Sequence, residues 1–207
     1  MFKKLPLGLL LISPFSALAH PHAFIDMQTK PLVKDNQLIG FSTQWLLDEA
    51  SSSAVLYDVK QAKGDKAAQQ KLVDDVMANV VNEHYFSYVF DKENHKIKYT
   101  KHPENYGMRV KGNEVEYYFD FLLAQPQALQ NNEFTLMTYD RTYYVAMRYA
   151  ETGKRSVDFS SLPANCKGEV LEPNVDEKIQ SYASSLDKSQ KNEDDSLGVL
   201  FAQKVKI

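Results

Sequence analysis

Two histidines near the amino terminus are the residues of this chain whose types and spacing best suit metal chemistry. They lie in the segment His20-Pro21-His22, directly after Ala19. Cleavage after Ala19 would give three nitrogen donors at one chain end, namely the α-amine of His20 and the two imidazoles. An α-amine titrates at about pH 8 and an imidazole at about pH 6.5, so both supply neutral nitrogen atoms around neutral pH. Zinc and copper favour such donors.

Pro21 decides between two modes of metal binding at this chain end. A free terminus with histidine in the third position binds copper or nickel in a plane by deprotonating two backbone amides, but proline has no amide hydrogen. The planar mode is therefore incomplete, and the amine, the two imidazoles and carboxylates from elsewhere in the fold remain. This donor set suits tetrahedral zinc and, less specifically, copper. The alternative is a frayed, solvated chain end without a metal.

Residues 1–19 have the features of a secretory signal peptide. Two lysines precede an apolar run at 5–12, and the small residues at 17–19 form a cleavage site between Ala19 and His20. The cleavage site has no cysteine, so no lipid anchor is expected there. No run of about twenty apolar residues follows the leader, so we do not expect the mature chain to span a membrane.

The composition indicates a globular domain and argues against several classes of function. The 207 residues are 43% hydrophobic and 25% charged, and the single cysteine, Cys166, cannot form an internal disulfide. The net charge of −3 becomes −5 without the two leader lysines, which argues against a general affinity for nucleic acid. We find no HExxH pair, phosphate-binding glycine loop or Ser/His/Asp signature, so we do not expect an enzyme.

The first half of the mature chain predicts a β-hairpin followed by two helices. Alternating residues predict strands at 22–33 and 38–46, with a turn between them. Asp48 begins a first helix, which continues past Val59, and a second helix runs from about Lys66 to Tyr85.

The remaining histidines are predicted to have structural or solvent-exposed positions. His84 falls on the apolar stripe of the second predicted helix, so a hydrogen-bonded core histidine is favoured over a ligand. His95 and His102 stand among lysines in turn-like sequence and should face solvent.

The second half of the chain predicts mostly antiparallel strands, followed by a tail that is first polar and then amphipathic. Strands are expected at 96–100, 107–110 and 114–122, with Pro126 ending the pattern, and a last hairpin from 134–139 and 143–149. We therefore predict an α+β fold, an antiparallel sheet or sandwich with two helices inserted after the first hairpin and a short C-terminal helix. The predicted organisation is an α+β domain at 20–183, a polar linker at 184–196 and an amphipathic segment at 197–207.

Several short motifs resemble a bacterial family of periplasmic proteins described as transport-system components, which includes the periplasmic member of the Zev zinc-utilisation system. The matching pieces are HPHAFID at 20–26, WLLDE at 45–49, YDRTYYV at 139–145, NC at 165–166 and LGVLFA at 197–202. The resemblance spans nearly the whole mature chain, and its opening motif is the most specific piece. Relatives often carry a second cysteine after the last apolar segment, which this chain lacks, so a disulfide from Cys166 to the tail is impossible here.

The resemblance implies a periplasmic zinc-binding protein that supports zinc uptake together with an inner-membrane metal permease. Asp48 and Asp140 fall in matched motifs at the ends of strands, so we add them to His20 and His22 as predicted metal ligands. The alternative role for each aspartate is a helix cap or a turn residue.

Three hypotheses follow, in this order. The first is a zinc carrier for uptake. The second is a copper enzyme in which His20 braces the ion, with His22 or His84 as a second imidazole. The third is a structural envelope protein without a metal.

Overall fold

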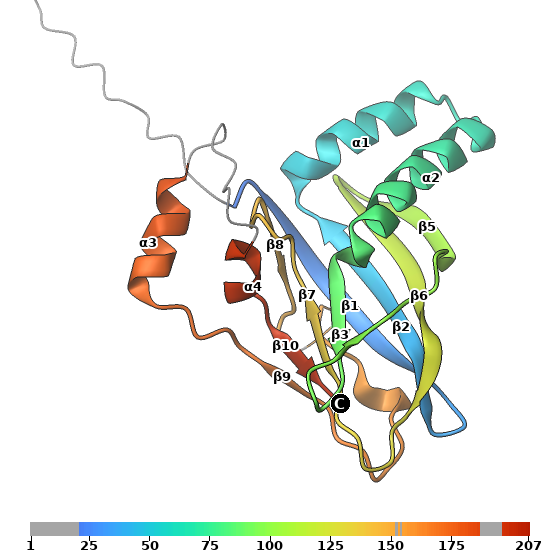
Figure 1. Ribbon diagram of the computed structural model, residues 1–207. Helices are drawn as coiled ribbons and strands as arrows, with labels where there is room; N and C mark the ends of the chain where they lie inside the picture. The colour runs from blue at the N-terminus through green and yellow to red at the C-terminus, as the bar shows by residue number, and fades with distance from the viewer. Residues whose placement is uncertain (1–20, 152, 154, 187–195) are drawn as a thin grey trace, which may run out of the picture.

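The fold is built from two five-stranded sheets, which the computed structural model in Figure 1 shows as two layers. The structure describes residues 21–151, 153, 155–186 and 196–207. The long sheet has, in spatial order, β5 (Glu104–Lys111), β6 (Glu114–Ala128), β2 (Gln37–Leu47), β1 (Ala23–Lys34) and β8 (Val145–Arg148). The short sheet has the order β4 (Lys96–Ile97), β3 (Ser87–Phe90), β7 (Thr135–Thr138), β10 (Lys204–Lys206) and β9 (Glu169–Leu171).

The predicted α+β class is confirmed, and the strands are mostly antiparallel as expected. The exception is the pairing of β1 with β8, which is parallel and aligns Ala23 with Val145. In the described part of the chain, no helix is long and apolar enough to cross a membrane.

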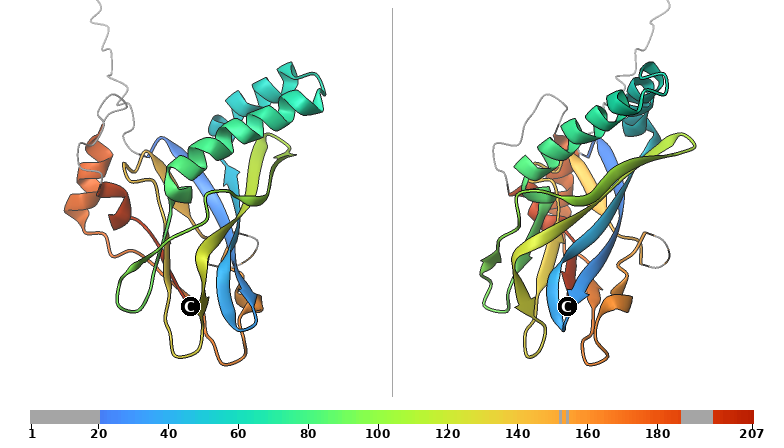
Figure 2. Two further views of the ribbon diagram at one scale, coloured as in Figure 1. Left: turned by 45° about the vertical axis from the view of Figure 1, so that its right-hand side comes forward. Right: turned by 90° about the vertical axis from the view of Figure 1, so that its right-hand side faces the viewer.

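The first hairpin and the two helices after it are also confirmed. Asp35 and Asn36 have positive φ angles of 51° and 58°, as the tight turn between β1 and β2 requires. Helix α1 (Glu49–Gln61) starts at the predicted cap, Asp48, and helix α2 (Lys66–Asn82) follows. Figure 2 shows these two helices beside one another across one end of the long sheet.

The core lies between the two sheets and is rich in aromatic rings. Trp45 of β2 meets Phe119 of β6 edge to face at 4.8 Å, and Tyr85 stacks on Phe121 at 5.2 Å. The short sheet contributes Val89 and Leu136, both of them fully buried. The odd-numbered residues of β6 from Val115 to Leu123 face this core, as the alternation at 114–122 predicts.

The predicted hairpin at 134–149 is wrong, because its two strands belong to different sheets. Strand β7 pairs with β3 in the short sheet, whereas β8 pairs with β1 in the long sheet. The segment 139–144 therefore carries the chain from one layer to the other. Strand periodicity identifies a strand but not its partner, and a short polar segment fits both a hairpin turn and a crossover.

Pro126 does not end β6, which continues to Ala128. Strand β5 pairs with β6 only as far as Asp120, and the register with β2 shifts between Leu38 and Gly40. Pro126 therefore lies in an irregular part of the ladder with no β5 partner, where a missing amide hydrogen is tolerated.

The C-terminal segment is only partly helical. The predicted short helix is confirmed as α4 (Leu197–Leu200), but Lys204–Lys206 form β10, which lies between β7 and β9 with Val205 fully buried. Helix α3 (Glu177–Ser185) was not predicted, and it includes the first two residues of the expected linker. Most of that linker, 187–195, lies outside the described residues, as do the predicted signal peptide and His20.

Candidate metal site at the start of the first strand

His22 is held at the start of β1 by the turn that precedes β8. Its backbone N–H donates to the carbonyl of Tyr144 over 2.9 Å, and the two rings lie 5.0 Å apart at an angle of 56°. The next residue, Ala23, already pairs with Val145 in the long sheet. His22 is half-buried. His22 itself therefore packs against the sheet, whereas His20 lies outside the described residues.

Asp48 joins the start of β1 to helix α1. Its carboxylate accepts hydrogen bonds from the backbone N–H groups of Ser51, at 2.6 Å, and Phe24, at 2.7 Å. Burial alone would raise the pKa of Asp48, but these backbone hydrogen bonds outweigh it and hold the pKa below its ordinary value. Asp48 therefore stays ionised near neutral pH and acts as the helix cap.

Asp140 organises the turn on the other side of β1. Its carboxylate accepts from the N–H of Thr142 at 3.1 Å and from the N–H of Val145 at 3.0 Å. Gly198 of α4 packs directly on the carbonyl oxygen of Asp140, where a Cβ would overlap it. Asp140 thus fixes the segment against which His22 and Ala23 lie.

The predicted aspartates therefore flank the chain end that carries the predicted histidines. Asp48 reaches Phe24 on the β2 side, and Asp140 holds the strand that pairs with Ala23 on the β8 side. Both carboxylates make the cap and turn contacts that the alternative interpretation expects. Within the described residues, His22, Asp48 and Asp140 do not form a group of three close ligand atoms. Because His20 lies outside these residues, the four-residue ligand set stays a prediction.

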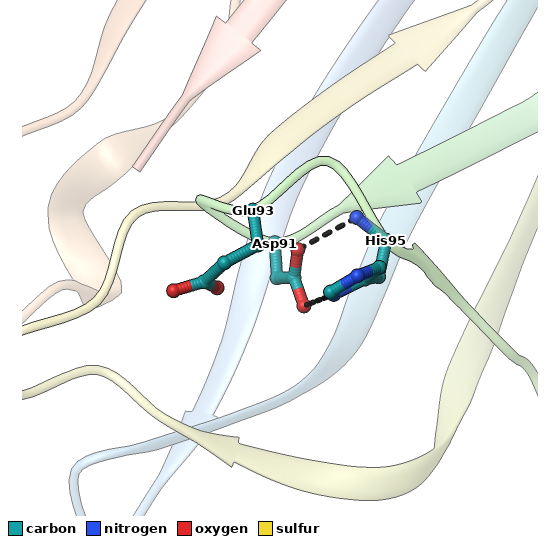
Figure 3. A group of neighbouring side chains, drawn as sticks. All are labelled: Asp91, Glu93 and His95. Atoms are coloured by element: carbon teal, nitrogen blue, oxygen red, sulfur yellow. Dashed lines mark hydrogen bonds and ion pairs between the residues drawn. The ribbon is translucent and has the colours of Figure 1, made fainter.

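Within the described part of the chain, one group of three residues has ligand atoms close enough to share a metal ion. Asp91, Glu93 and His95 lie in the turn between β3 and β4, with one ligand atom of each within 4.8 Å of the others (Figure 3). The Nδ1 atom of His95 is 3.2 Å from Asp91, whose pKa is lowered mainly by the backbone N–H of His95. His95 faces solvent, as predicted, whereas the grouping was not predicted, because its only signal in the sequence is the Asp-x-Glu-x-His spacing. Exposed acidic turns of this kind are common without a metal.

His84 is not the core histidine that the helical stripe predicts. Helix α2 ends at Asn82, and His84, Tyr85 and Phe86 form the turn η1 (His84–Phe86) with positive φ angles of 54°, 58° and 49°. The turn ends the helical stripe that predicts a buried His84, and instead Tyr85 is buried and His84 is exposed. His102 is exposed, as predicted.

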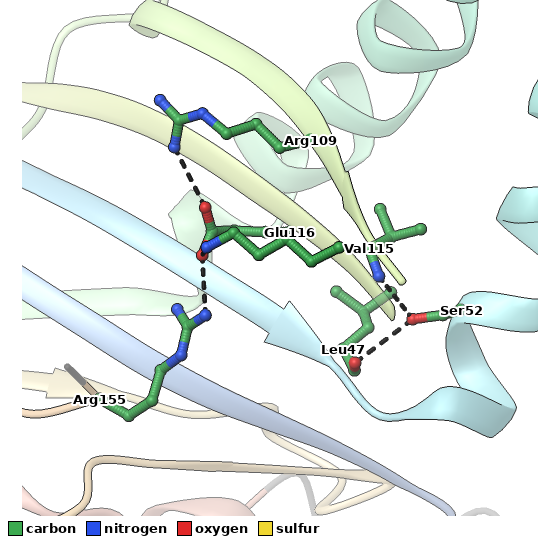
Figure 4. A network of polar contacts seen from close by, with 7 residues as sticks. Leu47, Ser52, Arg109, Val115, Glu116 and Arg155 are labelled. Atoms are coloured by element: carbon green, nitrogen blue, oxygen red, sulfur yellow. Dashed lines mark hydrogen bonds and ion pairs between the residues drawn. The ribbon is translucent and has the colours of Figure 1, made fainter. Parts of the chain in front are cut away.

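A buried carboxylate outside the predicted site ties the long sheet to the segment after β8. Glu116 has no exposed surface, and it pairs with Lys111 at 2.5 Å, Arg155 at 2.8 Å and Arg109 at 3.1 Å (Figure 4). Burial alone would raise the pKa of Glu116, but the three cationic partners outweigh it and lower the pKa. Glu116 is therefore an ionised anchor for Arg155. Sequence alternation places Glu116 on the outer face but cannot show that Arg155 covers it.

Figure 4 also shows how α1 is fixed to the same end of the sheet. The buried hydroxyl of Ser52 accepts from the N–H of Val115 at 2.9 Å and lies 3.3 Å from the carbonyl of Leu47. Together with Asp48, this contact makes the start of α1 part of the sheet end that carries the candidate site.

Comparison with known proteins places the chain in a family. The chain is 64% identical over 204 residues to an "Uncharacterized protein" of Haemophilus influenzae (strain ATCC 51907 / DSM 11121 / KW20 / Rd), with 99% of this chain and 97% of the relative covered. No solved structure matches it significantly. A family model described as "Protein of unknown function (DUF1007)" matches residues 5–207. The chain therefore belongs to the DUF1007 family.

Proposed function

We propose that the mature protein is a periplasmic zinc carrier that takes up the ion through His20 and His22 and delivers it to an inner-membrane metal permease. The observation that carries this proposal is the position of His22. Its backbone N–H and its ring both contact Tyr144. The neighbouring backbone is held on one side by Asp48, which accepts from Phe24, and on the other by Asp140, which accepts from Val145. A chain end fixed in this way loses less conformational entropy when it binds an ion than a freely moving end does.

The donor set supports zinc as the cargo. An amine and two imidazoles supply three of the four ligands of a tetrahedral zinc ion. Asp48 or Asp140 would supply the fourth only by giving up part of its hydrogen bonding to the backbone. Water or a donor from the permease could fill that position instead, and an incomplete protein shell suits an ion that must be released.

The surroundings of His22 also suit transfer to a partner. Phe24, two residues further along the chain, and Tyr144, which contacts His22, are 43% and 45% exposed. These exposed residues near His22 would let a membrane protein approach the chain end, and the buried Nε2 atom of His22 would have to be uncovered when the ion is bound or released.

Growth under zinc limitation tests this function in the cell. A strain without the protein should grow more slowly than its parent in medium with a zinc chelator, and added zinc should restore growth. The unaltered gene should complement the defect, whereas His20→Ala/His22→Ala should not, at an equal level in the periplasm. His95→Ala serves as the control and should complement fully. Complementation by the double histidine variant would contradict the proposal.

A further inference from the structure

A cavity lined by none of the predicted metal ligands has a chemical character that zinc binding does not explain. It has a volume of about 400 Å³ and lies between the end of α2 and the segment 96–101. This segment crosses from the short sheet to the long sheet, as Figure 1 shows, and the N–H of Thr100 donates to Leu122 at 2.9 Å. The volume falls within the range of sites that bind small molecules.

One side of the cavity is apolar and the other is cationic. Val81, Ile97, Tyr85 and Tyr99 are the apolar and aromatic residues that line it. Lys98, Lys101 and His84 are exposed and supply the polar part, and no described residue that lines the cavity is acidic.

The two lysines are available to a ligand. Among the ion pairs of the described residues, none includes Lys98 or Lys101, whereas the neighbouring Lys96 lies over the ring of Tyr88 at 4.5 Å. Their charge is therefore not compensated by a carboxylate of the described chain. This local positive charge stands out in a protein whose net charge is negative.

The tyrosines of the cavity add no negative charge near neutral pH. Burial raises the pKa of Tyr85 to about 12 and also raises the pKa of Tyr99. The hydroxyl of Tyr99 donates to the carbonyl of Ser87 at 2.7 Å. Both hydroxyls therefore stay neutral near neutral pH.

The turn η1, which shapes the cavity, is conformationally unusual. Three consecutive residues with side chains, His84, Tyr85 and Phe86, have positive φ angles, a region that L-residues rarely adopt. The core holds the turn in place, because Tyr85 stacks on Phe121 and the carbonyl of Phe86 accepts from Tyr139 at 2.8 Å. Such strained segments cluster at ligand sites. Here the turn places Tyr85 on the buried side of the cavity and His84 on its exposed side.

We propose that this cavity binds a small organic anion with an apolar chain, whose carboxylate is held by Lys98 and Lys101 and whose chain packs on Val81, Ile97 and the two tyrosines. The opposite charge of the lysines and the apolar wall together define this class of ligand. A metal cation would be repelled by the lysines. The site is separate from the amino-terminal histidines and does not depend on the zinc proposal.

Calorimetry with three probes tests this proposal. Octanoate carries both the charge and the chain, octylamine carries the chain with the opposite charge, and acetate carries the charge without the chain. We expect the mature protein to bind octanoate with one-to-one stoichiometry, and to bind the other two probes at least about tenfold more weakly. Equal binding of octylamine, or no binding of octanoate below the concentration at which it forms micelles, would overturn the proposal.

A matched pair of variants locates the site. Lys98→Gln/Lys101→Gln should weaken octanoate binding about tenfold or more, because both charge-assisted contacts are removed. Lys60→Gln/Lys63→Gln changes two exposed lysines at the end of α1 and should leave the affinity unchanged. Both variants alter only exposed side chains, so both should fold. If the two variants bind octanoate equally well, the lysines of the cavity do not hold the carboxylate and the assignment is wrong.

Discussion

Replacing His20 and His22 together with alanine is expected to weaken zinc binding to the mature protein by a factor of at least about 100. The change removes two of three proposed nitrogen donors and leaves an amine with whatever carboxylates face the ion. Loss of even an outer contact around a metal typically costs about 10- to 100-fold in affinity, and loss of two direct ligands should cost more. Competition with a chromophoric chelator measures the change.

The same variant should fold normally. His22 is half-buried and lies at the start of an outer part of the sheet, and its backbone hydrogen bond to Tyr144 does not depend on its side chain. We therefore expect a loss of about 1 kcal/mol or less in the free energy of unfolding, measured in chelator. Only the zinc-dependent rise in the thermal midpoint should disappear.

His95→Ala is the matched control for zinc affinity. It removes the histidine of the acidic turn, Asp91, Glu93 and His95, and should leave tight binding intact. If His95→Ala abolishes binding and the double variant retains it, the zinc site is in that turn.

Replacing Glu116 with glutamine is expected to destabilise the fold by about 3 kcal/mol, the lower end of the cost of breaking a buried ion pair. Glutamine keeps the shape but removes the negative charge that faces Arg109, Lys111 and Arg155. We expect the loss in the free energy of unfolding to be at the lower end of this range, because the side chains of Arg109 and Lys111 are 51% and 44% exposed and water still solvates them. Urea denaturation measures the change.

The pH dependence separates this charge effect from a loss of packing. The folded-state pKa of Glu116 is lowered, so its stabilising contribution is present above the unfolded-state value of about 4.3 and is lost as the pH falls through the folded-state pKa. The difference in stability between the unaltered protein and Glu116→Gln should therefore shrink below about pH 4. Glu83→Gln, at an exposed position, should show no comparable effect. A difference that stays constant down to pH 3 would mean that Glu116 stabilises the fold by packing alone.

Local patterns predicted the elements whose structure depends on neighbouring residues in sequence. The hairpin of β1 and β2 follows from alternation and from the Asp35-Asn36 turn, and α1 follows from the cap at Asp48. The pairing of β8 with β1 and the placement of β10 between β7 and β9 could not be predicted, because both are long-range pairings. At His84, the helical stripe continued in sequence after the backbone had already turned into η1.

The candidate site was also predictable only where it depends on residues that are close in sequence. The cap position of Asp48 and the turn position of Asp140 are local features of the sequence. The hydrogen bonds of the two carboxylates to the backbone show these cap and turn roles. Asp48 and Asp140 flank the start of β1 because β1 pairs in parallel with β8, and no local pattern indicates this pairing. The anchoring of Arg155 by Glu116 is likewise a contact between distant segments.

X-ray absorption at the zinc edge tests the central claim most directly. The sample is the mature chain loaded with one equivalent of zinc, with its start at His20 verified by intact mass. We predict nitrogen ligands at about 2.0–2.1 Å with the scattering pattern of two imidazoles, and the loss of that pattern in His20→Ala/His22→Ala. A shell of oxygen ligands alone, or a spectrum that is unchanged in the double variant, would contradict a zinc site at the amino terminus.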